Sequence, residues 1–177
     1  MNEETMKERG PYAKLDPPLR TYADQARLWD ALNDGVIDVL ASDHAPYTRE
    51  EKEKGWKNIF DAPSGGVVIE TTLPLMLNAV NEGKMGLERL VEVFSTNPAM
   101  INGVYPKKGA LNIGADADVV IVDMGKRFKI RVEDLKTIQK ITPYEGIEGI
   151  GAPVMTLLRG SVIYEDGQVT GKPGKGK

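Results

Sequence analysis

The chain has 177 residues, which is enough for one domain or one and a half. Its 41% hydrophobic and 28% charged residues are ordinary for a globular protein, and a net charge of −3 gives no reason to expect nucleic-acid binding. The absence of cysteine excludes disulfides and thiolate metal sites, and we expect neither a membrane span nor a signal peptide. These features fit a cytoplasmic location.

The amino-terminal part predicts a helix followed by a strand. Thr21 is placed to cap the helix, with Asp24 in the first turn. The buried face of this helix is expected to consist of four apolar residues, Ala26, Leu28, Trp29 and Leu32. The next stretch, Val36–Ala41, is β-branched and apolar apart from Asp38, which is typical of a buried strand.

Polar residues follow this expected strand at once. Ser42, Asp43 and His44 stand together, and Ala45-Pro46 ends regular structure. Parallel α/β folds present catalytic groups in this way, at the carboxyl end of a buried strand. For an isolated Asp-His pair, a turn-capping aspartate beside a surface histidine is the alternative. His44 is the one histidine of the chain.

The following hundred residues read as loops and then helices. The charge run 48–55 is expected to be a solvated loop rather than a short helix, and 60–66 is a breaker cluster in which glycines allow close approach of a ligand or form a plain turn. Three helices are predicted, over 70–82, over 87–94, and from a cap at Asn97 to Gly103.

The composition then changes from helical to β near 103–108. Strands are predicted over 117–122 and 128–132, and over 154–158 and 161–164 with a hairpin turn at Arg159-Gly160. A second hairpin is expected at 165–169. We therefore divide the chain into 1–103, 104–170 and a disordered Gly/Lys/Pro-rich tail, 171–177.

Six motifs occur in the order in which one enzyme family carries them. They are Pro17-Pro18-Leu19-Arg20, Ser42-Asp43-His44-Ala45-Pro46, Ala62-Pro63-Ser64-Gly65, Ile69-Glu70-Thr71-Thr72-Leu73-Pro74-Leu75, Ser95-Thr96-Asn97-Pro98-Ala99 and Gly114-Ala115-Asp116-Ala117-Asp118. From about residue 12 onward the chain thus resembles dihydroorotase, a cyclic amidohydrolase of the amidohydrolase superfamily. The resemblance implies an α/β fold, the carboxyl-terminal part of a metal-dependent (β/α)₈ TIM barrel with part of a small β-sandwich domain.

The resemblance also implies a pair of zinc ions, held by several histidines, a carboxylated lysine and one aspartate on the last barrel strand. Asp43 matches that aspartate, and the chain has one histidine and no cysteine for the other ligands. A barrel needs about 250 residues, whereas the barrel-like part here has about a hundred. We therefore expect a carboxyl-terminal segment that is inactive alone and that self-associates or pairs with an amino-terminal segment.

The resemblance assigns roles to six residues. Asp43 would contact metal and act as general base and then general acid. Pro63 and Gly65 belong to a loop whose backbone contacts the substrate ring, and His44 is expected to support the site rather than bind metal. Tyr47 and Asp16 depart from the histidine and asparagine usual in dihydroorotases. Tyrosine carries no positive charge and Asp16 adds a negative one, so both count against strict selection of an anionic substrate.

The expected function is hydrolysis of a small cyclic amide, namely the reversible conversion of dihydroorotate to carbamoyl-aspartate in pyrimidine biosynthesis. A hydantoinase or allantoinase is the alternative enzyme, which Tyr47 favours. A non-catalytic homologue that acts as a scaffold for aspartate transcarbamoylase is the alternative from a different class.

Overall fold

The computed structural model describes residues 1–174, which divide into two compact units. Unit 1 comprises Met1–Asp34, Ala41–Thr72 and Lys129–Glu148, and unit 2 comprises Gly35–Leu40, Leu73–Phe128 and Gly149 onward. The segments of each unit are interleaved along the sequence. The boundaries at 103 and 170 that the sequence suggested stay predictions.

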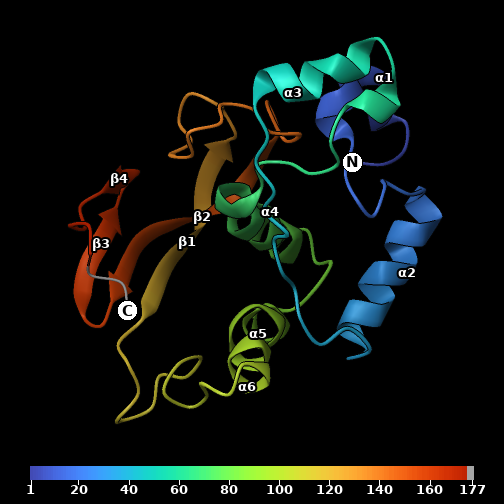
Figure 1. Cartoon of the computed structure of the whole chain (residues 1–177). Coiled ribbons are helices and arrows are strands. Elements are labelled where there is room, and N and C mark those ends of the chain that lie inside the picture. Colours follow the sequence, from blue (N-terminus) through green and yellow to red (C-terminus); the bar gives the residue numbers. More distant parts are fainter. Residues whose placement is uncertain (175–177) are drawn as a thin grey trace. The chain divides into compact units, whose positions relative to one another are not determined.

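Unit 1 begins with short helices, α1 (Thr5–Arg9) and the 3₁₀ turn η1 (Gly10–Ala13), before the longer α2 (Tyr22–Asn33) (Figure 1). The expected cap of α2 is confirmed. The Thr21 side chain accepts from the Asp24 N–H, and the Asp24 carboxylate accepts from the Thr21 N–H in return. Hydrogen bonds donated by the Thr21 hydroxyl and by the Thr21 N–H hold the pKa of Asp24 below its usual value.

The expected buried face of α2 is largely wrong. Within α2 only Leu32 is buried, while Ala26 is exposed and Leu28 is 56% exposed. The apolar spacing correctly indicates a helix. Burial, however, requires a second element against the apolar face, and the described residues leave most of this face in solvent.

The charge run is helical, so the expected solvated loop at 48–55 is wrong. Helix α3 (Arg49–Glu53) is followed by the 3₁₀ turns η2 (Lys54–Trp56) and η3 (Ile59–Asp61). Thr48 and Glu51 form a capping box, in which the Thr48 side chain accepts from the Glu51 N–H. This Thr-x-x-Glu signature satisfies the first free backbone donors and favours a helix despite the high charge.

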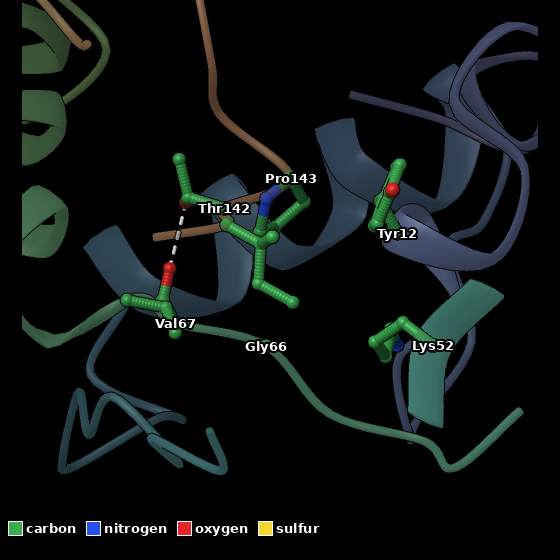
Figure 2. A pocket seen from close by; sticks show the side chains of 7 residues that line it. Tyr12, Lys52, Gly66, Val67, Thr142 and Pro143 are labelled. Atoms are coloured by element: carbon green, nitrogen blue, oxygen red, sulfur yellow. Dashed lines mark hydrogen bonds between the residues drawn. The ribbon is translucent and has the colours of Figure 1, made fainter. Parts of the chain in front are cut away.

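The core of unit 1 joins sequence-distant segments. Val67, Leu135 and Ile141 form a buried cluster, against which Tyr12 packs. The Thr142 hydroxyl donates to the Val67 carbonyl at 2.7 Å, a bond drawn in Figure 2. The irregular stretch 130–147 is therefore fixed against the residues just before α4 (Ile69–Asn81), which begins in unit 1 and continues in unit 2.

In unit 2 the helical residues 87–101 run without a break. Helix α5 (Leu87–Val91) passes into the π-helical turn η4 (Glu92–Thr96) and then α6 (Asn97–Ile101). The helix predicted over 70–82 matches α4, but the expected cap at Asn97 is wrong. Thr96 and Asn97 are both helical in backbone, and Asn97 is the first residue of α6 rather than its cap.

The buried strand expected over Val36–Ala41 is absent from the structure, and Val36 is 74% exposed. Hydrogen bonds with the side chains and backbone of the 87–101 helical run satisfy the backbone groups of this segment instead. Leu40 N–H donates to the Val93 carbonyl at 2.9 Å, and Arg89 and Asn97 donate to the carbonyls of residues 37 and 38. A strand exists only beside another strand, and within residues 1–174 none pairs with this segment.

One four-stranded sheet is formed in the order β1-β2-β3-β4 (Figure 1). Its strands are β1 (Val119–Lys129), β2 (Glu148–Leu158), β3 (Ser161–Glu165) and β4 (Gln168–Val169). Both expected hairpins are confirmed, since β2–β3 and β3–β4 are antiparallel with short turns. The two strands expected over 117–122 and 128–132 are instead the single strand β1.

The loop before β1 is tied to the first hairpin within unit 2. Asp118 accepts the Arg159 N–H at 2.7 Å and forms an ion pair with Lys108, which also pairs with Asp116 at 2.8 Å. Lys108 lowers the pKa of both carboxyl groups. The two aspartates of the Gly-Ala-Asp-Ala-Asp motif therefore stabilise the loop before β1 and its contact with the hairpin turn.

None of the helices formed by residues 1–174 has the length and apolarity needed to cross a membrane. The expected tail starts at Gly171, whose N–H donates to the Ile163 carbonyl at 3.1 Å. Residues 175–177 lie outside the described residues, so disorder of the tail stays a prediction.

Candidate functional site

Asp43 is exposed and has a backbone φ of +46°, in the left-handed region that few residues other than glycine adopt. Aspartate tolerates this region better than most residues because its short polar side chain can hydrogen-bond locally. Within residues 1–174 the Asp43 carboxylate makes no hydrogen bond or ion pair. It is therefore free to accept a proton or to contact a ligand.

His44 holds the Asp43 segment against the start of α4. Its Nδ1 accepts from the backbone N–H groups of Val68 and Ile69, at 3.2 and 3.3 Å. These are donors that the first turn of a helix leaves without an internal partner. An accepting Nδ1 carries no proton, so a neutral His44 has its proton on Nε2.

Tyr47 and Gly65, two of the expected substrate-binding residues, lie in contact. A Cβ added to Gly65 would stand 2.8 Å from the Ala45 Cβ and 2.9 Å from the Tyr47 Cε2. Gly65 also has a φ of +137°, and the Ala45 N–H donates to the Gly66 carbonyl at 3.2 Å. Glycine therefore permits the two loops to approach so closely.

Lys52 is the residue of this region that sequence reasoning missed. Its side chain is 1% exposed, and its Nζ donates to the carbonyls of Lys14, Pro63 and Gly65 at 3.0, 3.0 and 2.9 Å. Burial, with a smaller contribution from the Lys14 ammonium, lowers the pKa of Lys52 to about 8. Thr48-x-x-Glu51 signalled the helix that carries Lys52, but no local pattern indicates which lysine is buried.

Figure 2 shows how Lys52 and Tyr12 face the loop that contains Gly66. The cavity there, about 10 Å³, is no larger than a water molecule requires. It is lined by Tyr12, Lys52, Gly66, Val67, Ile141, Thr142 and Pro143. This side of the loop is thus packed, and a substrate would have to reach the loop from elsewhere.

Of the remaining expected residues, Pro63 joins the cluster through its carbonyl and Asp16 does not join it. The Asp16 carboxylate is exposed and makes no hydrogen bond or ion pair within the described part of the chain. Unit 1 has a hollow of about 370 Å³, lined by Arg9, Tyr12, Arg49 and Trp56 among others. None of the six expected site residues lines it.

A metal pair does not fit the described residues taken alone. Across residues 1–174, no group of three or more histidine, cysteine, aspartate or glutamate side chains is placed to hold a metal ion. Asp43 offers one carboxylate, and a zinc ion in a protein takes at least three protein ligands. We therefore assign no chemical step to a metal on the basis of this chain.

Comparison with known proteins gives consistent likenesses. The L-hydantoinase of Paenarthrobacter aurescens is 44% identical over 169 residues, and the dihydroorotase of Halobacterium salinarum is 38% identical over 175 residues. These alignments cover 95% and 99% of this chain but 37% and 40% of the relatives. The chain therefore spans about two fifths of their length.

The solved structure described as L-hydantoinase (dihydropyrimidinase) from Arthrobacter aurescens superposes with a TM-score of 0.94 at 41% identity. It matches 97% of this chain and 38% of its own chain. The expected fold class, an α/β chain forming part of a TIM-barrel amidohydrolase with part of its β-sandwich, is confirmed by this likeness.

The model of the family described as "Amidohydrolase family" matches residues 16–163. That range contains Asp43 with its free carboxylate, the Tyr47–Gly65 contact and the strands β1 and β2. On this match, the chain belongs to the amidohydrolase family.

Proposed function

We propose that this chain provides part of the active unit of an enzyme that hydrolyses cyclic amides. The observation that carries the proposal is Asp43, an accessible carboxylate held at a strained backbone position by the capping contact of its neighbour His44. In this proposal the Asp43 carboxylate takes the proton of the attacking water and passes it to the ring nitrogen that leaves. The contacting loops at Tyr47 and Gly65 bind the ring.

A neutral ring of the hydantoin type is our first choice of substrate. Tyr47 contributes a hydroxyl group and no positive charge, so it can hydrogen-bond a ring but cannot neutralise a carboxylate. The likeness to an L-hydantoinase, in sequence and in structure, supports the same choice. Dihydroorotate is the second candidate, favoured by the Ala62-Pro63-Ser64-Gly65 loop and by relatives named dihydroorotase. On that second choice the enzyme would serve pyrimidine biosynthesis.

Pairing with an amino-terminal segment, which would bring the remaining metal ligands and with them a zinc pair, completes the proposal. Tyr22 and Leu28 on α2 are 73% and 56% exposed, and an apolar surface of this kind is typically covered by a partner. We expect the 177-residue chain alone to self-associate. Light scattering at micromolar concentration that gives a clean 19.4 kDa monomer would contradict this expectation.

A chimera tests the catalytic proposal. This chain replaces the corresponding segment of the Paenarthrobacter aurescens L-hydantoinase, and turnover of hydantoin, dihydroorotate and allantoin is measured. Asp43→Asn should lower kcat by 10²-fold or more because the amide cannot accept the proton. Asp38→Asn, an exposed carboxylate five residues earlier, is the control and should keep full turnover.

Retained turnover in the Asp43→Asn chimera would remove Asp43 from the mechanism. A folded chimera that hydrolyses none of the three rings would exclude the catalytic proposal and favour the scaffold role for aspartate transcarbamoylase. The ratio of kcat/KM between hydantoin and dihydroorotate decides between the two substrates.

A further inference from the structure

Lys52 is a buried cation whose hydrogen bonds all end on backbone carbonyls. An ammonium group has three N–H donors, and the carbonyls of Lys14, Pro63 and Gly65 use all three. Among residues 1–174 no carboxylate pairs with it. Burying a charge is costly, and an apolar side chain of the same length would fill the space without that cost. The charge itself therefore needs an explanation.

The three carbonyls belong to two segments that also contact each other directly. The first segment contains Lys14, whose carbonyl accepts from the Gly65 N–H at 3.1 Å as well as from Lys52. Lys14 adds a second cross-link, since its own Nζ donates to the Ile59 carbonyl at 2.9 Å and to the Ala62 carbonyl at 2.5 Å. Two lysines thus fix the backbone from residue 59 to residue 65.

Fixing a carbonyl also fixes the N–H on the other side of the same peptide group. The peptide group is planar and trans, so its N–H points opposite to its C=O. Lys52 therefore sets the directions of the Ser64 N–H, through the Pro63 carbonyl, and of the Gly66 N–H, through the Gly65 carbonyl. The Ser64 N–H has no partner within residues 1–174, and Ser64 is half-buried. It is a free donor in the loop that contacts Tyr47 through Gly65.

We propose that Lys52 is a positioning residue, which orients the peptide groups of residues 63–66 so that a free backbone donor faces the substrate ring. This proposal rests on the proposed function, because it takes the 63–66 loop as part of the substrate site. Lys52 itself does not touch the substrate, since its ammonium is enclosed and fully used. Its loss should therefore weaken substrate binding more than it slows the chemical step.

The first test measures backbone order in the 177-residue chain by hydrogen exchange. Lys52→Met keeps the length of the side chain and removes the donors, while Lys57→Met removes an exposed lysine from the same charged segment as a control. We expect the Gly65 amide, bonded to the Lys14 carbonyl, to exchange at least tenfold faster in Lys52→Met and unchanged in Lys57→Met. Unchanged exchange in Lys52→Met would overturn the proposal.

If the Lys52→Met variant does not fold, hydrogen exchange of the unsubstituted chain tests the proposal instead. In native-state exchange over a urea series, peptides 12–16 and 62–66 should open together, because one ammonium holds both. Opening of 62–66 while 12–16 stays closed would overturn the proposal.

The second test uses the chimera described above. Lys52→Met should raise KM at least tenfold and change kcat by less than threefold, a split that general destabilisation would not produce. A KM within twofold of the unsubstituted chimera would overturn the positioning role. If the unsubstituted chimera hydrolyses no cyclic amide, the proposed function fails and the substrate role of Lys52 fails with it, whereas the exchange result still decides whether Lys52 holds the loop.

Discussion

Replacing Gly65 with alanine should destabilise unit 1 by about 2–6 kcal/mol, because two independent costs add at this position. A backbone φ of +137° is strained for any residue with a Cβ, at about 1–3 kcal/mol. The new methyl group would also stand 2.8 Å from the Ala45 Cβ and 2.9 Å from the Tyr47 Cε2. Relieving such crowding by shifting neighbours typically costs about 1–3 kcal/mol.

Gly146→Ala separates the two costs. Gly146 lies in the same unit and also has a positive φ, +80°, but an added Cβ would meet nothing within 4 Å. The Gly146→Ala variant should lose about 1–2 kcal/mol of unfolding free energy, the cost of the backbone conformation alone. Urea unfolding followed by tryptophan fluorescence reports on unit 1, since Trp29 and Trp56, the two tryptophans of the chain, both belong to it. Equal losses in the two variants would refute the close packing of the loops at Tyr47 and Gly65.

Three further results are expected. Thr48→Ala should cost about 1 kcal/mol in the same fluorescence assay because α3 loses its capping oxygen, and Thr48→Ser should restore most of it; no loss would contradict the capping box. His44→Ala should speed exchange of the Val68 and Ile69 amides, while His44→Asn, which keeps an acceptor in place of Nδ1, should slow it again; equal rates in both variants would argue against the cap. The pKa of Lys52, lowered from its usual 10.5 to about 8, means that the native state binds the proton less tightly than the unfolded state. The unfolding free energy should therefore rise by up to about 3 kcal/mol between pH 8 and 10.5, and this rise should be absent from Lys52→Met; parallel curves would refute it.

Local chemistry accounts for the elements that could be predicted from the sequence. The cap at Thr21, the apolar period of α4 and the hairpin turn at Arg159-Gly160 each depend on residues within a few positions of one another. The short charged helix α3 also had a local signal, the pair Thr48 and Glu51. A dense run of charges favours a solvated loop, and the capping box outweighs that tendency here.

The failures concern features that depend on distant residues. Residues 36–40 have the composition of a strand, but a strand also needs a neighbour, and the 87–101 helical run satisfies this backbone instead. The predicted buried face of α2 failed for the same reason: the apolar spacing indicates the helix correctly, but no described element covers the face. In both cases the local composition fits the predicted element, but none of the described residues supplies the neighbouring element that the prediction requires.

The residues of the candidate site likewise differ in whether local sequence or distant contacts determine them. The positions of Asp43, Tyr47 and Gly65 followed from motifs, and the structure brings Tyr47 and Gly65 together. Lys52 could not be found in this way, since its three acceptors converge from residues 14, 63 and 65 only after folding. Lys54, an exposed lysine two positions away, looks the same in the sequence.

The π-helical turn η4 (Glu92–Thr96) limits which insertions and deletions this chain can tolerate. In a π-helix each backbone carbonyl accepts a hydrogen bond from the N–H five residues later. For Val93 that residue is Pro98, which has no N–H to donate. The Leu40 amide supplies the missing donor. Deleting one residue here would restore ordinary spacing, but it would rotate everything after it by about 100° and carry the Asn97 amide away from the Asp38 carbonyl. A length change in this helix should therefore persist only together with a compensating change in residues 37–40.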